Sequence, residues 1–546
     1  MPTITLNKTV FEKLVGKELP LEQLKDRISM LGTDLEKIEG NEIHVEIFPN
    51  RPDLLSEQGF ARAFSSFIGV KTGLRKYEVK KSGEKIIVDP SVSMRPYTAC
   101  AIVKNLTFSE ERIKEIMQVQ EKLAVTFGRN RKKSAYGIYP IDKITFPVTY
   151  IAKDPSTVTF WPLGMEGNMN ASEVLEKHPK GQTYKHLTES WKKYPFFIDA
   201  KQKVMCMLPF TNSHDTGKVD DDTKDVFVEC TGNDLQNVQL ALNIITTVLA
   251  DMGGQIYSLD IEYPDKTITT PDLTPKKMDL DLSYINKLLG LKLGENKVKD
   301  LLEKMGFGYE KGEVLIPAYR ADILHQADLV EDIAIAYGYE NFEEEIPNVA
   351  TIGEESQLEK LSRKIRDILI GLRLLEVKNY HLTTREDLNE KLNVEEDVIP
   401  LQNALGEHNH LRNKILSSLL KNLADNQHHE YPQNLFEIGR VFTSGKSETG
   451  IVEKEHLAVV LCHEKTDFTE VKQVLDTLMQ SFGIEYEVKE SSHPSYIKGR
   501  VGEIILDGKK VGVIGELHPT VIEKWGMLMP IVCLEMDVDL LLKVTL

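Results

Sequence analysis

The stretch of residues 316–339, IPAYRADILHQADLVEDIAIAYGY, constrains this chain strongly because strand, turn and helix signals follow one another within it. A short apolar run meets Pro317, and the chain then turns through Arg320 and Asp322. Apolar side chains next recur at helical spacing, at Leu329, Val330, Ile333, Ala334 and Tyr337. The pattern predicts a helix that ends at Gly338.

Four carboxylates accompany this predicted helix. Asp328, Glu331 and Asp332 stand at i, i+3 and i+4, which places them on one face, and Asp322 lies in the preceding turn. A magnesium ion coordinated by their oxygens would relieve the repulsion among crowded carboxylates. Alternatively, Asp328 and Glu331 form a D-x-x-E capping box, which the helix dipole favours. The spacing alone slightly favours the cap over the metal.

The same order of signals occurs near the N-terminus, in PNRPDLLSEQGFARAFSSFIG. Pro49 precedes Arg51-x-Asp53, and a helix capped by Ser56 then runs to Gly69. This copy has no carboxylate cluster on its helix. We therefore predict that Arg-x-Asp is a structural turn in both copies, with the aspartate accepting hydrogen bonds from the backbone or from arginine.

Length and charge limit the possible functions. A chain of 546 residues is long enough for several domains. Its formal charge of -17 argues against a general binder of nucleic acid or anionic membranes, so any RNA contact must be local. The five cysteines are scattered, as expected for buried thiols in a reducing compartment. With neither a leader pattern nor an apolar run of ~20 residues, we expect a cytoplasmic protein without membrane contact.

Four regions are predicted. Residues 1–85 form a small α/β domain that ends in a polar linker at 80–85, and residues 90–265 form a second domain. Residues 270–346 carry two short helices and the acidic stretch. Residues 351–546 alternate helices, one of them at 411–426, with strands of a largely antiparallel sheet, which makes the whole chain an α+β multidomain protein.

Two polar groups stand out in region 90–265. The first is a basic cluster beside a tyrosine-rich strand: Arg129, Arg131, Lys132 and Lys133. It is either a solvated face or an edge that contacts RNA. The second is a loop and the strand after it, with Asn212, Ser213, His214, Glu229 and Thr231. These side chains either bind a small polar ligand and position a hydrolytic water or simply hold the loop together, and the lack of a paired nucleophile and base favours the simpler interpretation.

Six ordered motifs give this chain a family resemblance that covers essentially its whole length. They are PNRPDLLSEQGFAR, GRNRKKSAYGIYP, NSHDTGKVDDDTKDVFVECTGND, PAYRADILHQADLVEDIAIAYGY, NLFEIGRVF and VGVIGELHP. The chain resembles the β subunits of phenylalanyl-tRNA synthetases, in their shorter archaeal and eukaryotic form. The resemblance implies B1-like, B3/B4 editing and B5 domains, followed by an inactive class II synthetase-like domain built on an antiparallel sheet. It also implies an α2β2 tetramer that joins phenylalanine to tRNA(Phe), with ATP and phenylalanine bound by α.

The resemblance also implies site residues. It assigns Mg²⁺ to Asp322, Asp328, Glu331 and Asp332, in a site shared with α. It places hydrolysis of mischarged Tyr-tRNA(Phe) in region 90–265, where Glu229 matches a family glutamate and where Asn212, Ser213, His214 and Thr231 line the pocket. We hypothesise that Glu229 accepts the tyrosine hydroxyl.

This chain departs from the family pattern at two places. Gly137-Ile138-Tyr139-Pro140 replaces the G-x-H-D of some relatives, so a histidine contact there does not carry over. The stretch NALGEH, from Asn403, lacks an Asn-Pro pair that the family carries, which affects a local turn.

Nucleotide chemistry has little support in the sequence. FEIGR at residues 436–440 offers no F-R-x-E, and neither a G-x-G-x-x-R nor a phosphate-binding loop occurs. Without such arginines the chain cannot clamp ATP phosphates, so aminoacylation is expected in a separate α chain. Two alternatives stay open: a free-standing magnesium-dependent phosphoryl-transfer enzyme and a non-enzymatic RNA-binding scaffold.

Overall fold

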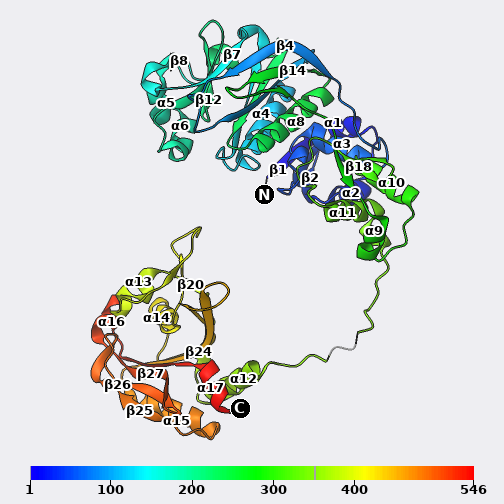
Figure 1. Cartoon of the computed structure of the whole chain (residues 1–546). Coiled ribbons are helices and arrows are strands. Elements are labelled where there is room, and N and C mark those ends of the chain that lie inside the picture. The colour runs from blue at the N-terminus through cyan, green and yellow to red at the C-terminus, as the bar shows by residue number, and fades with distance from the viewer. Residues whose placement is uncertain (1, 350–351, 546) are drawn as a thin grey trace. The chain divides into compact units, whose positions relative to one another are not determined.

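The computed structural model describes residues 2–349 and 352–545 (Figure 1). The chain forms two compact units, unit 1 (Met1–Glu345) and unit 2 (Ile346–Leu546). None of the helices in the described residues combines the length and apolar composition of a membrane span. All five cysteines are buried free thiols, as predicted.

Unit 1 begins with a three-stranded antiparallel sheet covered by helices. Its strands, in spatial order, are β1 (Thr3–Asn7), β3 (Glu42–Glu46) and β2 (Asp34–Glu39). Its helices are α1 (Lys8–Val15), α2 (Leu21–Met30) and α3 (Glu57–Phe67). Ser56 caps α3, as predicted, because its Oγ accepts a hydrogen bond of 2.9 Å from the Gly59 amide. Phe11, Phe60 and Phe64 pack ring against ring between α1 and α3.

A ten-stranded mixed sheet follows. Its spatial order is β12 (Thr211–Asn212), β11 (Val204–Met207), β10 (Tyr194–Ile198), β7 (Val148–Lys153), β4 (Val79–Val88), β14 (Gln255–Glu262), β5 (Tyr97–Lys104), β13 (Val226–Gly232) and β6 (Ser134–Pro140), with β15 (Thr267–Thr270) paired to β14. Strand β4 lies between β7 and β14 and pairs with both in parallel. The predicted linker at residues 80–85 is therefore wrong, because this polar segment is a strand inside the sheet.

The two ends of this sheet approach each other. Tyr139 on β6 donates a hydrogen bond to Asn212 on β12, although these strands stand at opposite ends of the spatial order. We call the junction of β6 and β12 the seam. Helices α4 (Glu110–Val125) and α8 (Leu235–Asp251) pack on the sheet in the core that also contains the N-terminal module. The short elements β8 (Thr159–Phe160), β9 (Met169–Asn170), α5 (Ala171–Lys177), α6 (Pro179–Tyr184) and α7 (His214–Gly217) complete this part.

The last part of unit 1 is a small sheet with three helices. Strands β16 (Lys276–Asp279), β18 (Glu313–Ile316) and β17 (Gly308–Glu310) pair antiparallel. The helices are α9 (Leu282–Leu289), α10 (Glu295–Lys304) and α11 (Gln326–Tyr337). Helix α11 ends at Gly338, whose φ of 92° is rarely adopted by residues with a side chain, so the predicted helix end is confirmed.

Unit 2 is built on a seven-stranded sheet. Its spatial order is β19 (Leu375–Glu376), β23 (Gln433–Ser444), β24 (Ile451–Cys462), β28 (Ile531–Asp537), β27 (Lys509–Leu517), β26 (Tyr496–Leu506) and β25 (Glu487–Glu490). Every pairing except β19 with β23 is antiparallel, which confirms the predicted sheet type.

Helices pack on both faces of this sheet. One apolar core contains residues of α12 (Gln357–Gly371), α15 (Phe468–Ser481) and α17 (Val538–Thr545). The other contains residues of α14 (Leu416–Asp425) and α16 (Pro519–Lys524). The remaining elements are α13 (Arg385–Leu388) and the strands β20 (Leu382–Thr383), β22 (His410–Leu411) and β21 (Ile399–Pro400). The helix predicted at 411–426 is shorter at its start because residue 411 belongs to β22.

Candidate functional site

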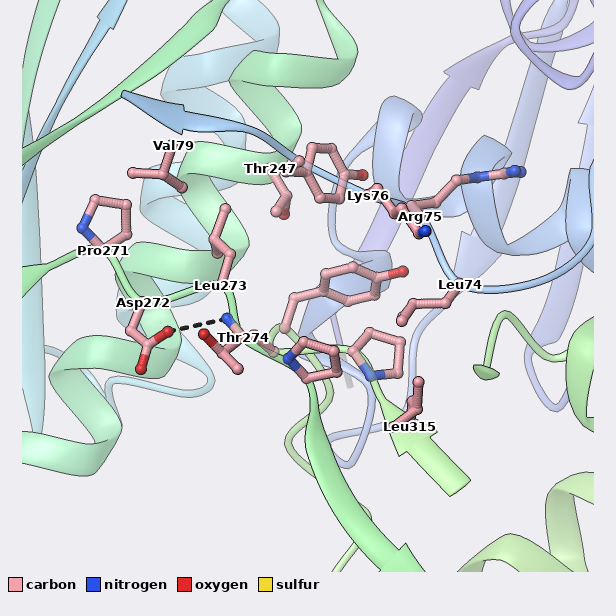
Figure 2. A pocket seen from close by; sticks show the side chains of 15 residues that line it. Leu74, Arg75, Lys76, Val79, Thr247, Pro271, Asp272, Leu273, Thr274 and Leu315 are labelled. Atoms are coloured by element: carbon pink, nitrogen blue, oxygen red, sulfur yellow. Dashed lines mark hydrogen bonds between the residues drawn. The ribbon is translucent and has the colours of Figure 1, made fainter. Parts of the chain in front are cut away.

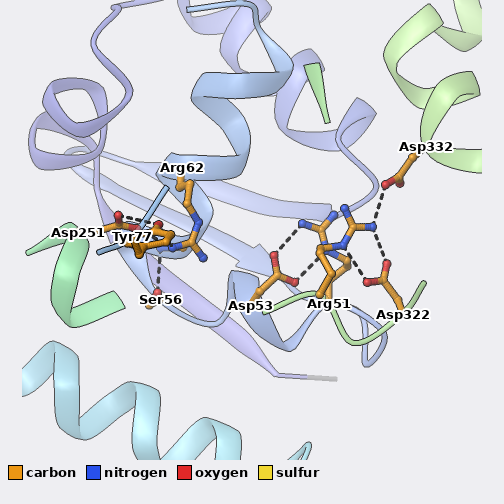
Figure 3. A network of polar contacts seen from close by, with 10 residues as sticks. Arg51, Asp53, Ser56, Arg62, Tyr77, Asp251, Asp322 and Asp332 are labelled. Carbon is orange, nitrogen blue, oxygen red and sulfur yellow. Dashed lines mark hydrogen bonds and ion pairs between the residues drawn. The ribbon is translucent and has the colours of Figure 1, made fainter. Parts of the chain in front are cut away.

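The Arg-x-Asp turn of residues 320–322 is held by a bidentate ion pair (Figure 3). Arg320 Nε donates to Asp322 Oδ1 at 2.8 Å, and Nη2 donates to Oδ2 at 2.7 Å. The same Nη2 donates to Asp332 Oδ2 on α11 at 2.8 Å. Burial opposes the charge of Arg320, but Asp332 and Asp322 outweigh it and hold its pKa above the usual value.

The N-terminal copy has the same geometry. Arg51 Nε and Nη2 donate to the two oxygens of Asp53 at 2.9 and 2.8 Å. Burial alone would raise the pKa of Asp53, but the Arg51 and Arg320 guanidiniums lower it below its usual value. The two copies thus meet in one buried ionic cluster, and the structural role predicted for Arg-x-Asp is confirmed.

Asp328 caps the start of α11. Its Oδ2 accepts hydrogen bonds from the amides of Leu324 and His325, both at 2.8 Å. His325 is the N-cap residue, and its Nδ1 accepts from the Ala327 amide at 3.1 Å. The cap interpretation of Asp328 is correct, but the predicted D-x-x-E pairing is wrong, because the box partner is His325 and Glu331 is exposed.

The four carboxylates do not converge on one point among the described residues of this chain. Asp322 and Asp332 pair with Arg320, Asp328 binds backbone amides, and Glu331 points to solvent. Across residues 2–349 and 352–545, no group of three His, Cys, Asp or Glu side chains is placed to hold an ion. The predicted magnesium site at Asp322, Asp328, Glu331 and Asp332 does not fit this geometry, because a buried guanidinium already neutralises two of its carboxylates.

A second polar network ties the three parts of unit 1 together (Figure 3). Arg62 of α3 donates to Asp251 at 2.6 Å and to the Tyr77 hydroxyl at 3.0 Å, and its guanidinium lies 4.0 Å from the ring centroid of Tyr319. A cavity of about 480 Å³ lies beside Tyr77 and Tyr319, with the proline-rich segment 271–275 on its wall (Figure 2). None of the predicted site residues lines this cavity.

A larger cavity, of about 880 Å³, lies at the seam. Its apolar side includes Phe108, Ile113, Ile116, Ile138 and Phe210. Its polar side includes Arg131, His178, Lys180, Asn212 and His214. Such a cavity can hold a ligand with an aromatic or aliphatic body and an acceptor-rich end. Two of the residues predicted for the pocket, Asn212 and His214, line it.

Glu229 lies behind this cavity and does not line it. Its side chain is fully buried on β13, where the Tyr139 hydroxyl lies 3.2 Å from Oε1. Oε2 is buried without a hydrogen-bond partner in the described structure. Burial raises the pKa of Glu229 to about 8, with Tyr139, Arg95 and Arg131 opposing the shift. The hypothesis of a direct contact between Glu229 and a ligand therefore conflicts with its zero exposure.

Ser213 and Thr231 have structural contacts. Ser213 is the N-cap of α7, and its Oγ accepts from the Asp215 amide at 3.3 Å. Thr231 binds Arg95, which donates from Nε to Oγ1 at 3.2 Å and from Nη2 to the carbonyl at 2.9 Å. Both residues are buried, so neither lines the cavity.

His214 is held in place by an aromatic stack. Its ring lies 3.9 Å from that of Trp161, with an angle of 15° between the planes, and its amide donates to the Trp161 carbonyl at 2.7 Å. Sequence reasoning missed Trp161, Arg95 and the structural importance of Tyr139. The replacement of the family histidine by Tyr139 was the one signal that pointed to this place.

The basic cluster divides between surface and interior. Arg129 and Lys132 are exposed, whereas Lys133 is half-buried. Arg131 donates to Glu121 at 2.8 Å and across the seam to the Pro209 carbonyl at 3.0 Å. Residues 129–131 all have positive φ, between 48° and 63°, which bends this loop back over the end of α4. Two of the four predicted RNA-contact residues are thus available on the surface.

The FEIGR strand of unit 2 has no free clamp for phosphates. Arg440 is exposed and pairs with Glu453 at 2.8 Å. Glu437 is fully buried and lies 2.8 Å from Arg412, which is also fully buried. A side-chain carbon at Gly439 would lie 2.4 Å from Arg412 Nη2, so the glycine leaves room for this guanidinium.

Comparison with known proteins finds matches in both units. Residues 278–339 match the tRNA synthetase B5 domain, and residues 343–538 match the phenylalanyl tRNA synthetase beta chain CLM domain. A phenylalanine–tRNA ligase beta subunit from Thermococcus gammatolerans is 41% identical, with 98% of each chain covered. This chain belongs to the phenylalanine–tRNA ligase β-subunit family.

Other members of the β-subunit family have similar sequences and, for one fragment, a similar fold. The beta subunit from Pyrococcus furiosus is 41% identical, over 98% of this chain and 99% of its own. A crystal structure of an N-terminal fragment of the beta subunit from Pyrococcus horikoshii matches with a TM-score of 0.60 and 41% identity. That fragment aligns over its full length and covers 62% of this chain.

Proposed function

We propose that this chain is the β subunit of a phenylalanine–tRNA ligase that works in the cytoplasm as an α2β2 tetramer with its α subunit and tRNA(Phe). Similarity over 98% of the chain to named β subunits carries the proposal. The same similarity supports the layout as a B1-like module, a B3/B4 module around the ten-stranded sheet, a B5 module and a class II synthetase-like domain. Because β4 belongs to the ten-stranded sheet, we propose that the B3/B4 module starts at about residue 79.

Aminoacylation belongs to the α subunit in this proposal. In FEIGR, Arg440 is exposed and paired with Glu453, and Glu437 is paired with buried Arg412. These groups cannot grip ATP phosphates, which need convergent cations. ATP and phenylalanine would therefore bind α. Because magnesium is usually held through nucleotide phosphates, we assign it to α as well and give the α11 carboxylates no part in metal binding.

Editing is the reaction that we propose for this chain itself. The cavity at the seam is large enough for a tyrosyl ester, with apolar side chains around the ring and Asn212 and His214 at the polar end. Hydrolysis needs a water held at the ester carbonyl, and a donor that binds the phenol oxygen would favour tyrosine over phenylalanine. The exposed Arg129 and Lys132 would contact the tRNA backbone.

Co-expression with the α subunit tests this proposal. We expect one complex with the mass of a tetramer, which charges tRNA(Phe) with phenylalanine and deacylates Tyr-tRNA(Phe), while the β chain alone does not consume ATP. Charging by β alone would contradict the assignment of aminoacylation to α. A complex that charges normally but leaves Tyr-tRNA(Phe) intact would contradict the editing proposal.

A further inference from the structure

Three polar side chains form a line across the seam. The Tyr139 hydroxyl of β6 lies 3.2 Å from Oε1 of Glu229 on β13 and 3.1 Å from Oδ1 of Asn212 on β12. Tyr139 and Glu229 are fully buried, and Asn212 lines the large cavity. The line therefore runs from the interior of the sheet to the cavity wall.

Two glycines leave room for the two ends of this line. Gly137 pairs directly with Glu229, and a side-chain carbon there would lie 2.4 Å from Tyr139 Oη and 2.6 Å from Glu229 Oε1. At the other end, a side-chain carbon on Gly217 would lie 2.6 Å from Asn212 Cβ. None of these three distances is compatible with a methyl group, so the backbone at both positions is shaped around the three side chains.

The line has fewer hydrogen-bond donors than acceptors unless Glu229 is protonated. A tyrosine hydroxyl has one proton, so Tyr139 cannot satisfy two acceptors at once. If Glu229 is protonated, it donates to Tyr139 and Tyr139 donates to Asn212 Oδ1, which satisfies both contacts of the line. If Glu229 is ionised, Tyr139 donates its hydrogen bond to the carboxylate instead, and Asn212 Oδ1 loses its donor. The pKa of about 8 for Glu229 favours the first arrangement at neutral pH.

We propose that Tyr139 is a positioning residue that, with Glu229, holds the Asn212 amide so that its Nδ2 faces the cavity as a hydrogen-bond donor. An amide has one acceptor end and one donor end, and the bond from Tyr139 fixes which end faces the ligand. The ligand must present an acceptor oxygen there. This inference rests on the proposed editing function, in which the oxygen is the ester carbonyl or the phenol oxygen of a tyrosyl ester.

Charged and titratable groups on all sides of Glu229 affect its proton. Arg95 and Arg131 are the nearby cations, and both favour ionisation. However, Arg95 uses its N–H groups on Thr231 and the Arg131 carbonyl. The other titratable neighbours are thiols and phenols whose pKa values burial raises, so they are uncharged near pH 8: Cys100, Tyr139, Tyr150, Cys206 and Cys230. Burial therefore outweighs the two arginines, and the carboxyl keeps its proton.

The arrangement can be tested without any ligand. In the full chain labelled with ¹⁵N-asparagine, the side-chain resonances of Asn212 are assigned by their loss in Asn212→Asp. We expect them to move as pH rises through about 8 and to stay fixed in Glu229→Gln, because glutamine also donates to Tyr139. In Tyr139→Phe they should no longer follow pH. Tyr136→Phe removes a hydroxyl from the same strand and is the matched control, with Asn243 as an internal reference for folding.

Kinetics on the assembled complex provide the second test. Below pH 8 we expect Tyr139→Phe to slow deacylation of Tyr-tRNA(Phe) about tenfold, the effect of one hydrogen bond. We also expect the wild-type rate to fall above pH 8 and the rate of Tyr139→Phe not to. Phenylalanine charging stays unchanged. A loss in kcat for both tyrosyl and phenylalanyl esters identifies the carbonyl as the ligand oxygen, whereas a loss of discrimination identifies the phenol.

The two tests separate the possible failures. If the wild-type complex does not deacylate Tyr-tRNA(Phe), the editing function is wrong, and the Asn212 resonances still decide whether Tyr139 orients the amide. If those resonances follow pH in Tyr139→Phe as they do in the wild type, the positioning role is wrong, whatever the deacylation rate.

Discussion

Arg320, Arg51 and Arg412 each bring a guanidinium into the interior, and each meets at least one buried carboxylate. Both members of such a pair remain charged because each stabilises the charge of the other. Removing either one would leave an uncompensated charge in the low-dielectric interior. Glu229 has no such partner, since Arg95 spends its donors on Thr231 and a backbone carbonyl. A carboxyl without a paired cation lowers its cost of burial by keeping its proton.

The proton on Glu229 gives unit 1 a pH-dependent stability. Its pKa is about 8 in the folded chain and about 4.5 when unfolded, so folding takes up a proton between these values. The contribution is fully present below pH 4.5 and falls as pH rises through about 8, by up to about 1.4 kcal/mol per pH unit. Melting temperatures measured from pH 6 to 9 should fall more steeply for the wild type than for Glu229→Gln. Parallel curves would show that Glu229 is ionised in the native state.

At the scale of single elements, two carboxylates of α11 have different roles: Asp328 caps the start of the helix, and Glu331 is exposed. Asp328→Ala removes the acceptor for two backbone amides and should cost about 1 kcal/mol, the usual value of a lost cap. Glu331→Ala, on the same helix, should change the stability by less than about 0.5 kcal/mol because its side chain is exposed. Denaturant unfolding of both variants, with and without magnesium, measures this. A stabilisation by magnesium that Glu331→Ala abolishes would restore the metal interpretation.

Because β6 and β13 approach closely at Gly137, a larger side chain at this position should destabilise the protein. In Gly137→Ala the new methyl group meets Tyr139 Oη and Glu229 Oε1 at distances that require the strands to move, and overpacking of this kind costs about 1–3 kcal/mol. Gly294→Ala is the matched control, because its side-chain carbon would meet no atom within 4 Å. Thermal unfolding should show a clear decrease for the first variant and a small one for the second. Equal changes would mean that the backbone at Gly137 adapts freely.

The sequence predicted those elements whose signals are local. The two short helices predicted in region 270–346 are α9 and α10, and Ser56 and Gly338 bound their helices as expected. Strand β4 was missed because its first half is exposed and charged, and its pairing with β14 involves residues far along the chain. Strands are predicted from apolar residues that alternate with polar ones, and the exposed first half of β4 lacks that alternation.

The candidate site was predicted only in part, because some of its contacts join residues that are far apart in the sequence. Asn212 and His214 follow one another in a polar loop, and both line the cavity. The contact of Tyr139 with Asn212 joins residues 73 positions apart, and only the closure of the sheet brings them together. Helical spacing places Asp332 near Asp328, but it does not show that Arg320 binds both Asp322 and Asp332.

On the scale of the whole molecule, the chain consists of two units with separate cores. One core of unit 1 joins the N-terminal module, the ten-stranded sheet and the B5 module, and the cores of unit 2 lie on the two faces of its own sheet. An N-terminal fragment of the Pyrococcus horikoshii relative that covers 62% of this chain has been crystallised. A core of this size should unfold cooperatively by itself, so we expect two thermal transitions in the intact chain.

Arg320 in unit 1 and Arg412 in unit 2 are both buried, and the loss of either should affect its own unit alone. Arg320→Met removes the guanidinium that pairs with Asp322 and Asp332 in unit 1, and Arg412→Met removes the one that pairs with Glu437 in unit 2. Breaking a buried pair costs about 3–5 kcal/mol, enough to shift a melting transition by several degrees. Calorimetry of the full chain should therefore show one transition lowered by Arg320→Met and the other by Arg412→Met. If either variant lowered both transitions together, the two units would unfold as one, and the stability of the cavity at the seam would depend on unit 2.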